Sequence, residues 1–144
     1  MSYSSLIELL RSQARERPNE IALSYYPAQD EVAQAITFTD LEAKSKVFAE
    51  TLREHSLPGD RILICLPQSI DYIIAFFGSI HAGAIPVTAY PPRPRKIDRR
   101  LNSIISDSGP SVIIGREEHL TAISQLAGAT TESPRVLSFG IGPE

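Results

Sequence analysis

The chain has 144 residues, of which 42% are hydrophobic and 22% charged, and its formal net charge is −3. This length allows one domain with its own core, the composition excludes a disordered chain, and the small charge indicates neither an acidic nor a basic partner. The longest apolar segment, residues 70–80, contains Asp71 and is too short to span a bilayer, and residues 1–8 lack a signal-peptide pattern. We therefore expect a soluble, cytoplasmic protein without a membrane span.

The first part of the chain predicts two helices and a hairpin. Ser5–Glu8 and Thr39–Glu42 have the spacing of capping boxes, in which a hydroxyl and a carboxylate satisfy free amides at a helix start. Residues 20–26 and 35–38 read as the two strands of a hairpin, joined by a polar loop at 27–33. The residues that these two helices should bury are Leu6, Leu9, Leu10, Ala14, Leu41, Phe48 and Leu52.

From residue 61 onward the chain alternates strands and helices. Residues 61–66 form an apolar run without polar alternation, which predicts a strand covered on both faces, as in a parallel sheet. Further strands are expected at 85–87, 111–114 and 135–139, and further helices at 70–81, capped by Ser69, and at 97–106 and 117–126. This order predicts an α/β fold with a largely parallel sheet and helices on both faces. Because the chain stops directly after a strand, we expect the domain to be incomplete.

Four short motifs lie in an order similar to the opening of the adenylate-forming enzymes, the AMP-dependent ligase superfamily. They are the helix and strand around Ala14–Leu23, then Ile36–Leu41, Leu57–Ile62 and Ala82–Val87. In the second motif Phe38 and Asp40 stand where the family usually has Tyr and Glu. The following turn, Tyr90–Pro94, together with Asp107–Pro110, resembles the fatty-acyl-AMP ligase branch of that superfamily.

The resemblance implies that residues 1–144 are the N-terminal portion of an AMP-binding domain, truncated before its phosphate loop. The complete protein would use ATP and Mg²⁺ to activate a fatty acid, then pass the acyl group to a phosphopantetheine thiol of an acyl carrier protein in polyketide or lipopeptide synthesis. An acyl-CoA ligase and an amino-acid adenylation domain of the same superfamily are the alternatives.

The family's phosphate loop, its adenine- and magnesium-contacting motifs and a lysine-bearing C-terminal domain follow later in its members. No catalytic, cofactor-binding or metal-ligating residue is therefore carried over to this chain. The nearest glycine-rich candidate, Gly140–Pro143, lacks a following Lys, Ser or Thr, and its proline removes an amide donor. We expect the 144-residue chain alone to be inactive and to bind no cofactor.

A basic segment follows the Tyr-Pro-Pro turn. Its five cations within residues 93–100 are Arg93, Arg95, Lys96, Arg99 and Arg100. They could dock an acidic partner such as a carrier protein, or they could be a solvated loop and helix start that Asp98 partly compensates. Nucleic acid is not expected, because no aromatic residue interleaves with the cations and the overall charge is negative. A non-catalytic α/β module that docks a partner through this segment is the second hypothesis.

The cysteine and the histidines are expected to have structural rather than catalytic roles. The single cysteine, Cys65, lies inside the apolar run and is expected to be a buried core residue. His55, His81 and His119 lack metal-ligand spacing, and His81 is expected to have a structural capping role at a helix end, where a cation would favour the dipole. No Gly-x-Ser-x-Gly elbow surrounds a serine, which argues against a hydrolase.

Three aromatic residues on the predicted helix 70–81 have two interpretations. Tyr72, Phe76 and Phe77 could line an acyl tunnel, but aromatic residues at this spacing are more often part of a core, and we favour the core.

Overall fold

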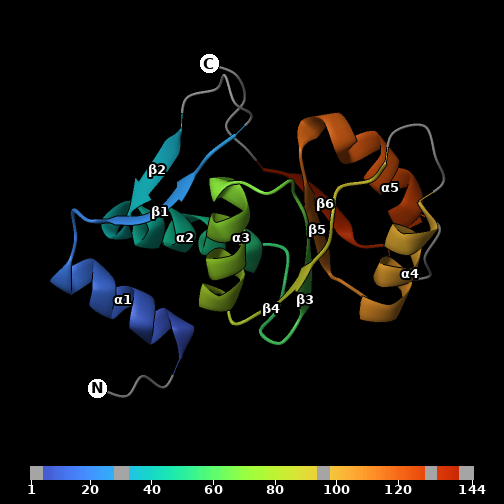
Figure 1. Cartoon of the computed structure of the whole chain (residues 1–144). Helices are drawn as coiled ribbons and strands as arrows, with labels where there is room; N and C mark the ends of the chain where they lie inside the picture. The colour runs from blue at the N-terminus through green and yellow to red at the C-terminus, as the bar shows by residue number, and fades with distance from the viewer. Residues whose placement is uncertain (1–4, 28–32, 94–97, 129–132, 140–144) are drawn as a thin grey trace.

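The computed structural model describes residues 5–27, 33–93, 98–128 and 133–139 (Figure 1). Its elements, in chain order, are α1 (Leu6–Glu16), β1 (Ile21–Tyr25), β2 (Gln34–Thr37), α2 (Phe38–Arg53), β3 (Arg61–Cys65), α3 (Ile70–His81), β4 (Ile85–Thr88), α4 (Arg99–Ser108), β5 (Val112–Gly115), the 3₁₀ turn η1 (Glu117–His119), α5 (Leu120–Gly128) and β6 (Arg135–Ser138). Parts of the predicted 27–33 loop, the start of the predicted 97–106 helix and the Gly140–Pro143 segment lie outside the described residues.

A parallel sheet of four strands, in the order β4-β3-β5-β6, forms the centre of the fold. Ile62 of β3 stands opposite Pro86 of β4 on one side and Val112 of β5 on the other. Proline is tolerated in β4 because that strand has one neighbour among the described residues, so a missing amide donor can face away from the ladder. Strands β1 and β2 form a separate antiparallel hairpin.

Helices cover both faces of the sheet, as the sequence predicted (Figure 1). Ile62 and Ile64 of β3 pack toward α1, α2 and α3, whereas Leu63 and Cys65 of the same strand pack toward α4 and α5. All four side chains are fully buried. The strand therefore contributes alternate residues to two separate cores, which explains why its sequence shows no polar alternation.

The chain winds in both directions from β3. It reaches β4 through α3 on one face, then passes to β5 on the far side of β3 through α4 on the other face. The segments that leave the carboxyl ends of β3 and β5 consequently go to opposite faces of the sheet. In open α/β sheets such a switch point opens a crevice where ligands bind.

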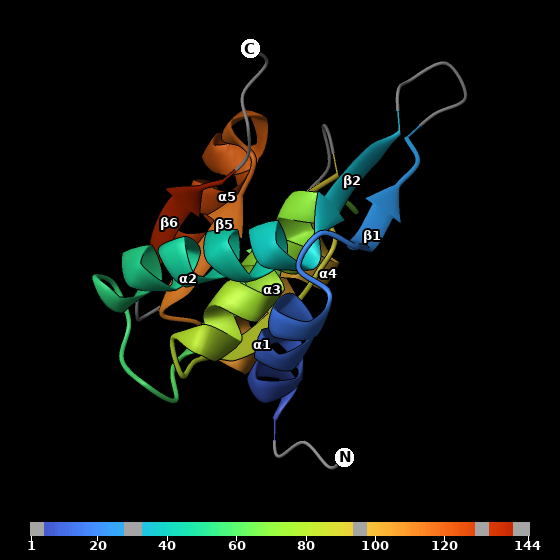
Figure 2. The same ribbon diagram turned by 90° about the vertical axis from the view of Figure 1, so that its left-hand side faces the viewer.

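On the face of the sheet that Ile62 and Ile64 of β3 pack toward, α2 crosses α3 closely, and α1 lies beside them (Figure 2). The buried residues Leu41, Phe48 and Leu52 of α2 confirm the predicted apolar face of that helix. In α1, Leu10 and Ala14 are buried as predicted, but Leu6 is 49% exposed, which corrects the prediction for that residue. Leu6 lies in the first turn of α1, at the end remote from the hairpin.

The start of α2 differs from the predicted capping box. The helix begins at Phe38, and Thr37 is its cap, since the Thr37 hydroxyl accepts the backbone N–H of Asp40 at 3.2 Å. Thr39, the predicted cap, instead donates its hydroxyl to the carbonyl of Pro18 at 2.8 Å. The other two predicted caps are confirmed: Ser5 accepts the N–H of Glu8 and Ser69 accepts that of Tyr72.

Candidate functional site

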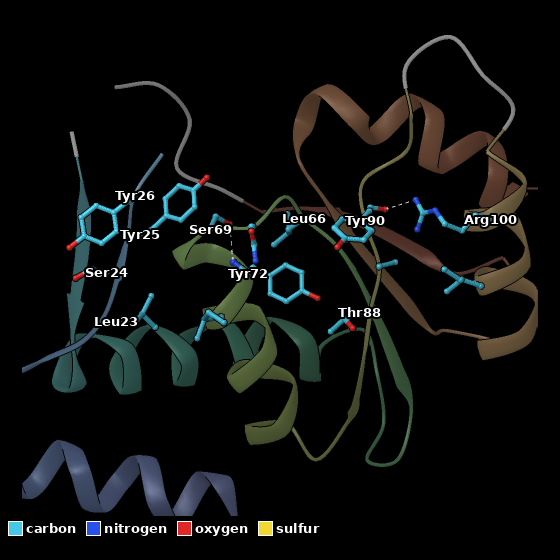
Figure 3. Close-up of a pocket in the computed structure, with 14 residues that line it drawn as sticks. Leu23, Ser24, Tyr25, Tyr26, Leu66, Ser69, Tyr72, Thr88, Tyr90 and Arg100 are labelled. Atoms are coloured by element: carbon cyan, nitrogen blue, oxygen red, sulfur yellow. Dashed lines mark hydrogen bonds between the residues drawn. The ribbon is translucent and has the colours of Figure 1, made fainter. Parts of the chain in front are cut away.

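A cavity of about 840 Å³ lies at the carboxyl ends of β3 and β4, between the β1–β2 hairpin and α4 (Figure 3). This volume falls within the range of about 300–1,000 Å³ that is usual for small-molecule sites. The residues that line it are Leu23, Ser24, Tyr25, Tyr26, Leu66, Gln68, Ser69, Tyr72, Ile73, Thr88, Ala89, Tyr90, Arg100 and Ile104. Its walls are thus mainly aliphatic and aromatic, with a few polar groups.

The loop after β3 sets the orientation of α3 at the edge of the cavity. The Ser69 hydroxyl accepts the N–H of Tyr72 at 3.2 Å and donates to the carbonyl of Pro67 at 2.9 Å. This cap places Tyr72 in the first turn of α3, where its ring lines the cavity. Phe76 and Phe77 pack edge to face at 5.7 Å and contact the core on that face of the sheet. The favoured core interpretation therefore fits the two phenylalanines, and Tyr72 contacts both the core and the cavity.

Asp98 organises the basic segment. It is 5% exposed and caps α4, where one carboxylate oxygen accepts the N–H of Leu101 at 3.0 Å. The other oxygen accepts the N–H of Arg93 at 3.2 Å and pairs with the Arg100 guanidinium at 3.3 Å. Burial by itself would raise the pKa of Asp98, but the N–H groups of Leu101 and Arg93, with the Arg100 charge, outweigh it and lower the pKa. Asp98 is therefore an ionised, buried anchor rather than a solvated counter-charge.

The described arginines of the basic segment differ in exposure and in their contacts. Arg93 and Arg99 are exposed, whereas Arg100 is half-buried at the cavity. Through Nη2, Arg100 donates to the carbonyls of Tyr90 and Pro91 at 3.3 and 3.5 Å. Its guanidinium also lies 5.8 Å from the centre of the Tyr90 ring, within range of a cation–π contact. Arg95 and Lys96 lie outside the described residues.

An ion pair at the switch point was not anticipated from the sequence. Arg116, which follows β5, donates to Asp71 in the first turn of α3 at 2.6 Å and to the carbonyl of Phe139 at 3.3 Å. The two side chains are 20% and 13% exposed. Arg116 and Asp71 are 45 residues apart in the chain, and no local sequence pattern links them. Only the topology, which brings the end of β5 to the start of α3, places them together.

The remaining candidates have structural roles. Cys65 is buried as predicted, and burial raises the pKa of its thiol to about 12. Burial, with the nearby cations Arg11 and Lys46, lowers the pKa of His81, which disfavours a positive charge on its ring at the end of α3. The Arg53 guanidinium supplies that charge instead, because it donates to the carbonyl of His81 at 2.8 Å.

The residues that line this cavity do not fit a magnesium site. Magnesium prefers carboxylate oxygens, but no carboxylate lines the cavity, and no three His, Cys, Asp or Glu side chains in the described part of the chain could hold an ion. Ser69 is occupied by capping, and Asp71 pairs with Arg116 rather than with a histidine. The mainly apolar lining of the cavity is suited to contact with an apolar ligand. None of the described helices is long and apolar enough to cross a membrane.

Residues 10–139 match the model of a protein family described as AMP-binding enzymes. A protein of Mycobacterium tuberculosis named as a fatty-acid–CoA ligase is 32% identical over 128 residues, which are 87% of this chain and 22% of that protein. A long-chain-fatty-acid–AMP ligase of Mycobacterium marinum is 32% identical over 133 residues, which are 90% of this chain and 23% of that protein. The chain thus spans about a fifth of the length of these curated relatives.

The fold is also similar to that of a solved ligase. The crystal structure of a fatty acyl-adenylate ligase from L. pneumophila, in complex with acyl adenylate and pyrophosphate, matches with a TM-score of 0.81 and 25% sequence identity. The match covers 95% of this chain and 23% of that one. Sequence and fold comparisons therefore agree on the same group of proteins.

Proposed function

Because the chain belongs to the family of AMP-binding enzymes, we propose that it forms the opening part of a ligase that activates a fatty acid with ATP. One observation carries the proposal: nearly the whole chain is similar in sequence to a fatty-acid–AMP ligase and in fold to a fatty acyl-adenylate ligase. The mainly apolar cavity at the carboxyl edge of the sheet is compatible with a lipid substrate. We propose the cytoplasm as its location, in keeping with the free, buried thiol of Cys65.

The proposed reaction has two steps. A carboxylate oxygen of the fatty acid attacks the α-phosphorus of ATP, the bond to the β-phosphate breaks, and pyrophosphate leaves. The sulfur of a phosphopantetheine thiol then attacks the acyl carbon, and AMP leaves. We assign neither step to a described residue. Instead, the described residues would supply the parallel sheet, its covering helices and the anchored loop after β4, which support a site completed by other residues, including those for magnesium.

The complete reading frame provides the test. Sequencing the transcript beyond the Glu144 codon is expected to show a Ser/Thr/Gly-rich loop and a lysine-bearing C-terminal domain. The full protein should release pyrophosphate from ATP when fatty acids are added, and the 144-residue chain alone should not. Absence of pyrophosphate release with all carboxylic acids tested would overturn the proposal. Efficient transfer to CoA, with none to a holo carrier protein, would overturn the proposed acceptor and leave the activation step standing.

Docking of the carrier protein is proposed at the basic segment. Arg93 and Arg99 are its exposed described members, and carrier proteins present an acidic surface that could pair with them. In the full enzyme, Arg99→Glu should reduce transfer to the carrier, relative to adenylate formation, by about tenfold or more. Arg15→Glu is the matched control, since Arg15 is an exposed residue of α1, far from α4 (Figure 1). Equal effects of the two variants would refute docking at this segment.

A non-catalytic docking module is the alternative that uses the same exposed cations. It predicts that the reading frame stops after Glu144 and that the 144-residue protein is monomeric and melts cooperatively. Aggregation of the isolated chain would instead favour a ligase fragment, because an unpaired strand edge and an uncovered apolar face promote association.

A further inference from the structure

The loop after β4, residues 89–93, has few backbone contacts of its own to hold it in place. Ala89 extends the ladder by donating its N–H to a carbonyl of β3 at 3.0 Å. Pro91 and Pro92 have no N–H to donate, and Tyr90 is 76% exposed, so its ring is not part of the core. Side chains from outside the loop must therefore fix its path along the cavity.

Two side chains at the start of α4 supply this anchoring. One carboxylate oxygen of Asp98 accepts the N–H of Arg93 at 3.2 Å, at the end of the loop. The same oxygen pairs with Arg100 at 3.3 Å, and the Arg100 guanidinium in turn donates to the carbonyls of Tyr90 and Pro91. The side chains of Asp98 and Arg100 are 3% and 33% exposed. The middle and the end of the loop are thus attached to the helix through one buried carboxylate.

The position of the Tyr90 ring depends on the same anchor. Tyr90 and Arg100 both line the cavity, and Figure 3 shows the Arg100 side chain reaching toward Tyr90 from the α4 side. The guanidinium lies 5.8 Å from the centre of the ring, and its pairing with Asp98 fixes its direction. Because no core packing holds the ring, loss of the Asp98 charge would release both the ring and the backbone beneath it.

We propose that Asp98 is a positioning residue for the ligase reaction: through Arg93 and Arg100 it holds residues 89–93 in the conformation that the substrates meet. The inference rests on the proposed function, and it adds a residue that acts without touching a substrate. A loop that is ordered in the free protein spares the substrate the entropy cost of ordering it on binding. If the loop adopted this conformation in only about a fifth of the molecules, the apparent affinity would fall about fivefold, while the bound complex would react unchanged.

Asp98→Asn separates the two tasks of this carboxylate, which caps α4 and anchors the loop. Asparagine is as good a helix cap as aspartate, so its oxygen can still accept the N–H of Leu101. Its NH₂ group is a donor, however, and would face two other donors, the N–H of Arg93 and the guanidinium of Arg100. In the full enzyme we expect this variant to raise the KM for the fatty acid or for ATP by about fivefold and to leave kcat within about twofold.

Two comparisons separate positioning from a general loss of stability, and urea unfolding establishes that each variant is folded. Asp107→Asn makes the same change at an exposed residue in the last turn of α4, and should leave KM and kcat within about twofold. Arg100→Gln breaks the next contact toward the loop and should raise the same KM. The double variant should raise it no further than the stronger single variant. If Asp98→Asn does not fold, Arg100→Gln takes its place against the same control.

Fluorine NMR of the full enzyme labelled with 3-fluorotyrosine follows the Tyr90 ring directly. Tyr90→Phe identifies the Tyr90 signal by its loss. Asp98→Asn should move this signal toward that of free fluorotyrosine and narrow it, because the ring loses its fixed contact with the guanidinium. Asp107→Asn should leave the signal where it is.

Three results would overturn the inference. They are unchanged KM values for both substrates in Asp98→Asn, equal effects of Asp98→Asn and Asp107→Asn, and single-variant effects that multiply in the double variant. Pyrophosphate release by the wild-type enzyme is measured first. If it occurs and Asp98→Asn leaves both KM values unchanged, the positioning role is wrong and the proposed function stands. If no carboxylic acid releases pyrophosphate, the proposed function fails, and the fluorine signal alone decides whether Asp98 fixes the loop.

Discussion

Replacing Gly78 by alanine sets two known effects against each other. Gly78 lies within α3, where a glycine is normally less favourable than alanine by about 0.5–1 kcal/mol. A methyl group at this position, however, would lie 2.6 Å from Cδ1 and 3.2 Å from Cβ of Phe48, and 3.1 Å from the backbone oxygen of Ser45. Glycine therefore allows α2 and α3 to approach closely, and alanine would force them apart.

Relief of that contact is restricted. The Phe48 ring packs at a tilt of 55° against Phe139, with a centroid distance of 4.5 Å, so it cannot turn away without disturbing the residue that follows β6. The Ser45 oxygen belongs to the backbone of α2 and can move only with the helix. Overpacking of this kind costs about 1–3 kcal/mol. When the helical preference for alanine is subtracted from the middle of that range, we expect Gly78→Ala to lower the free energy of unfolding by about 1–1.5 kcal/mol.

Urea unfolding followed by far-UV circular dichroism measures this loss, and thermal unfolding should show a melting temperature lower by about 3–6 °C. Gly128→Ala is the matched control, because Gly128 ends α5 and no atom lies within 4 Å of its added methyl group. That variant should be as stable as the wild type or more stable by up to about 1 kcal/mol. If Gly78→Ala matches Gly128→Ala in stability, the packing of α2 on α3 is looser than described and the reasoning is refuted.

Three further predictions concern titratable groups. The pKa of Asp98 is lowered in the folded chain, so its ionised carboxylate stabilises the fold fully above the unfolded pKa of about 4, and this stabilisation is lost as the pH falls through the folded pKa. Asp98→Ala should therefore lower the free energy of unfolding by about 1–2 kcal/mol at pH 7 and should weaken this dependence on acid. Urea midpoints at pH 7 and pH 3 measure both effects. A lowered His81 pKa means that the folded state binds protons less readily, so stability should fall as the pH drops below about 6.5, and His81→Gln should remove that part of the decline between pH 7 and 5. Cys65, with a pKa raised to about 12, should react with a thiol reagent at pH 8 only after unfolding, and rapid labelling of the folded chain would contradict its burial.

Local sequence patterns predicted most of the elements. The apolar run at 61–66 is the buried strand β3, and Ser69 caps α3 as predicted, since both depend on side chains within a few residues of each other. The start of α2 was predicted two residues late because Thr37 and Thr39 are both suitable caps. A hydrogen bond from Thr39 to the carbonyl of Pro18, 21 residues away, accompanies the choice of Thr37. No local pattern contains that contact.

The sequence by itself determined the alternation of strands and helices, the family and the burial of Cys65, because periodicity, capping and short motifs are properties of neighbouring residues. Only the tertiary structure decided that Tyr25, Tyr72 and Tyr90 share one cavity and that Arg116 pairs with Asp71. It also decided that Arg100 turns toward the loop after β4 while Arg99 faces solvent. These contacts join residues from separate elements, and the winding of the sheet about β3 brings those elements together. The physical reason is that side-chain chemistry fixes which partners are acceptable, whereas strand order and helix packing fix which partners come within reach.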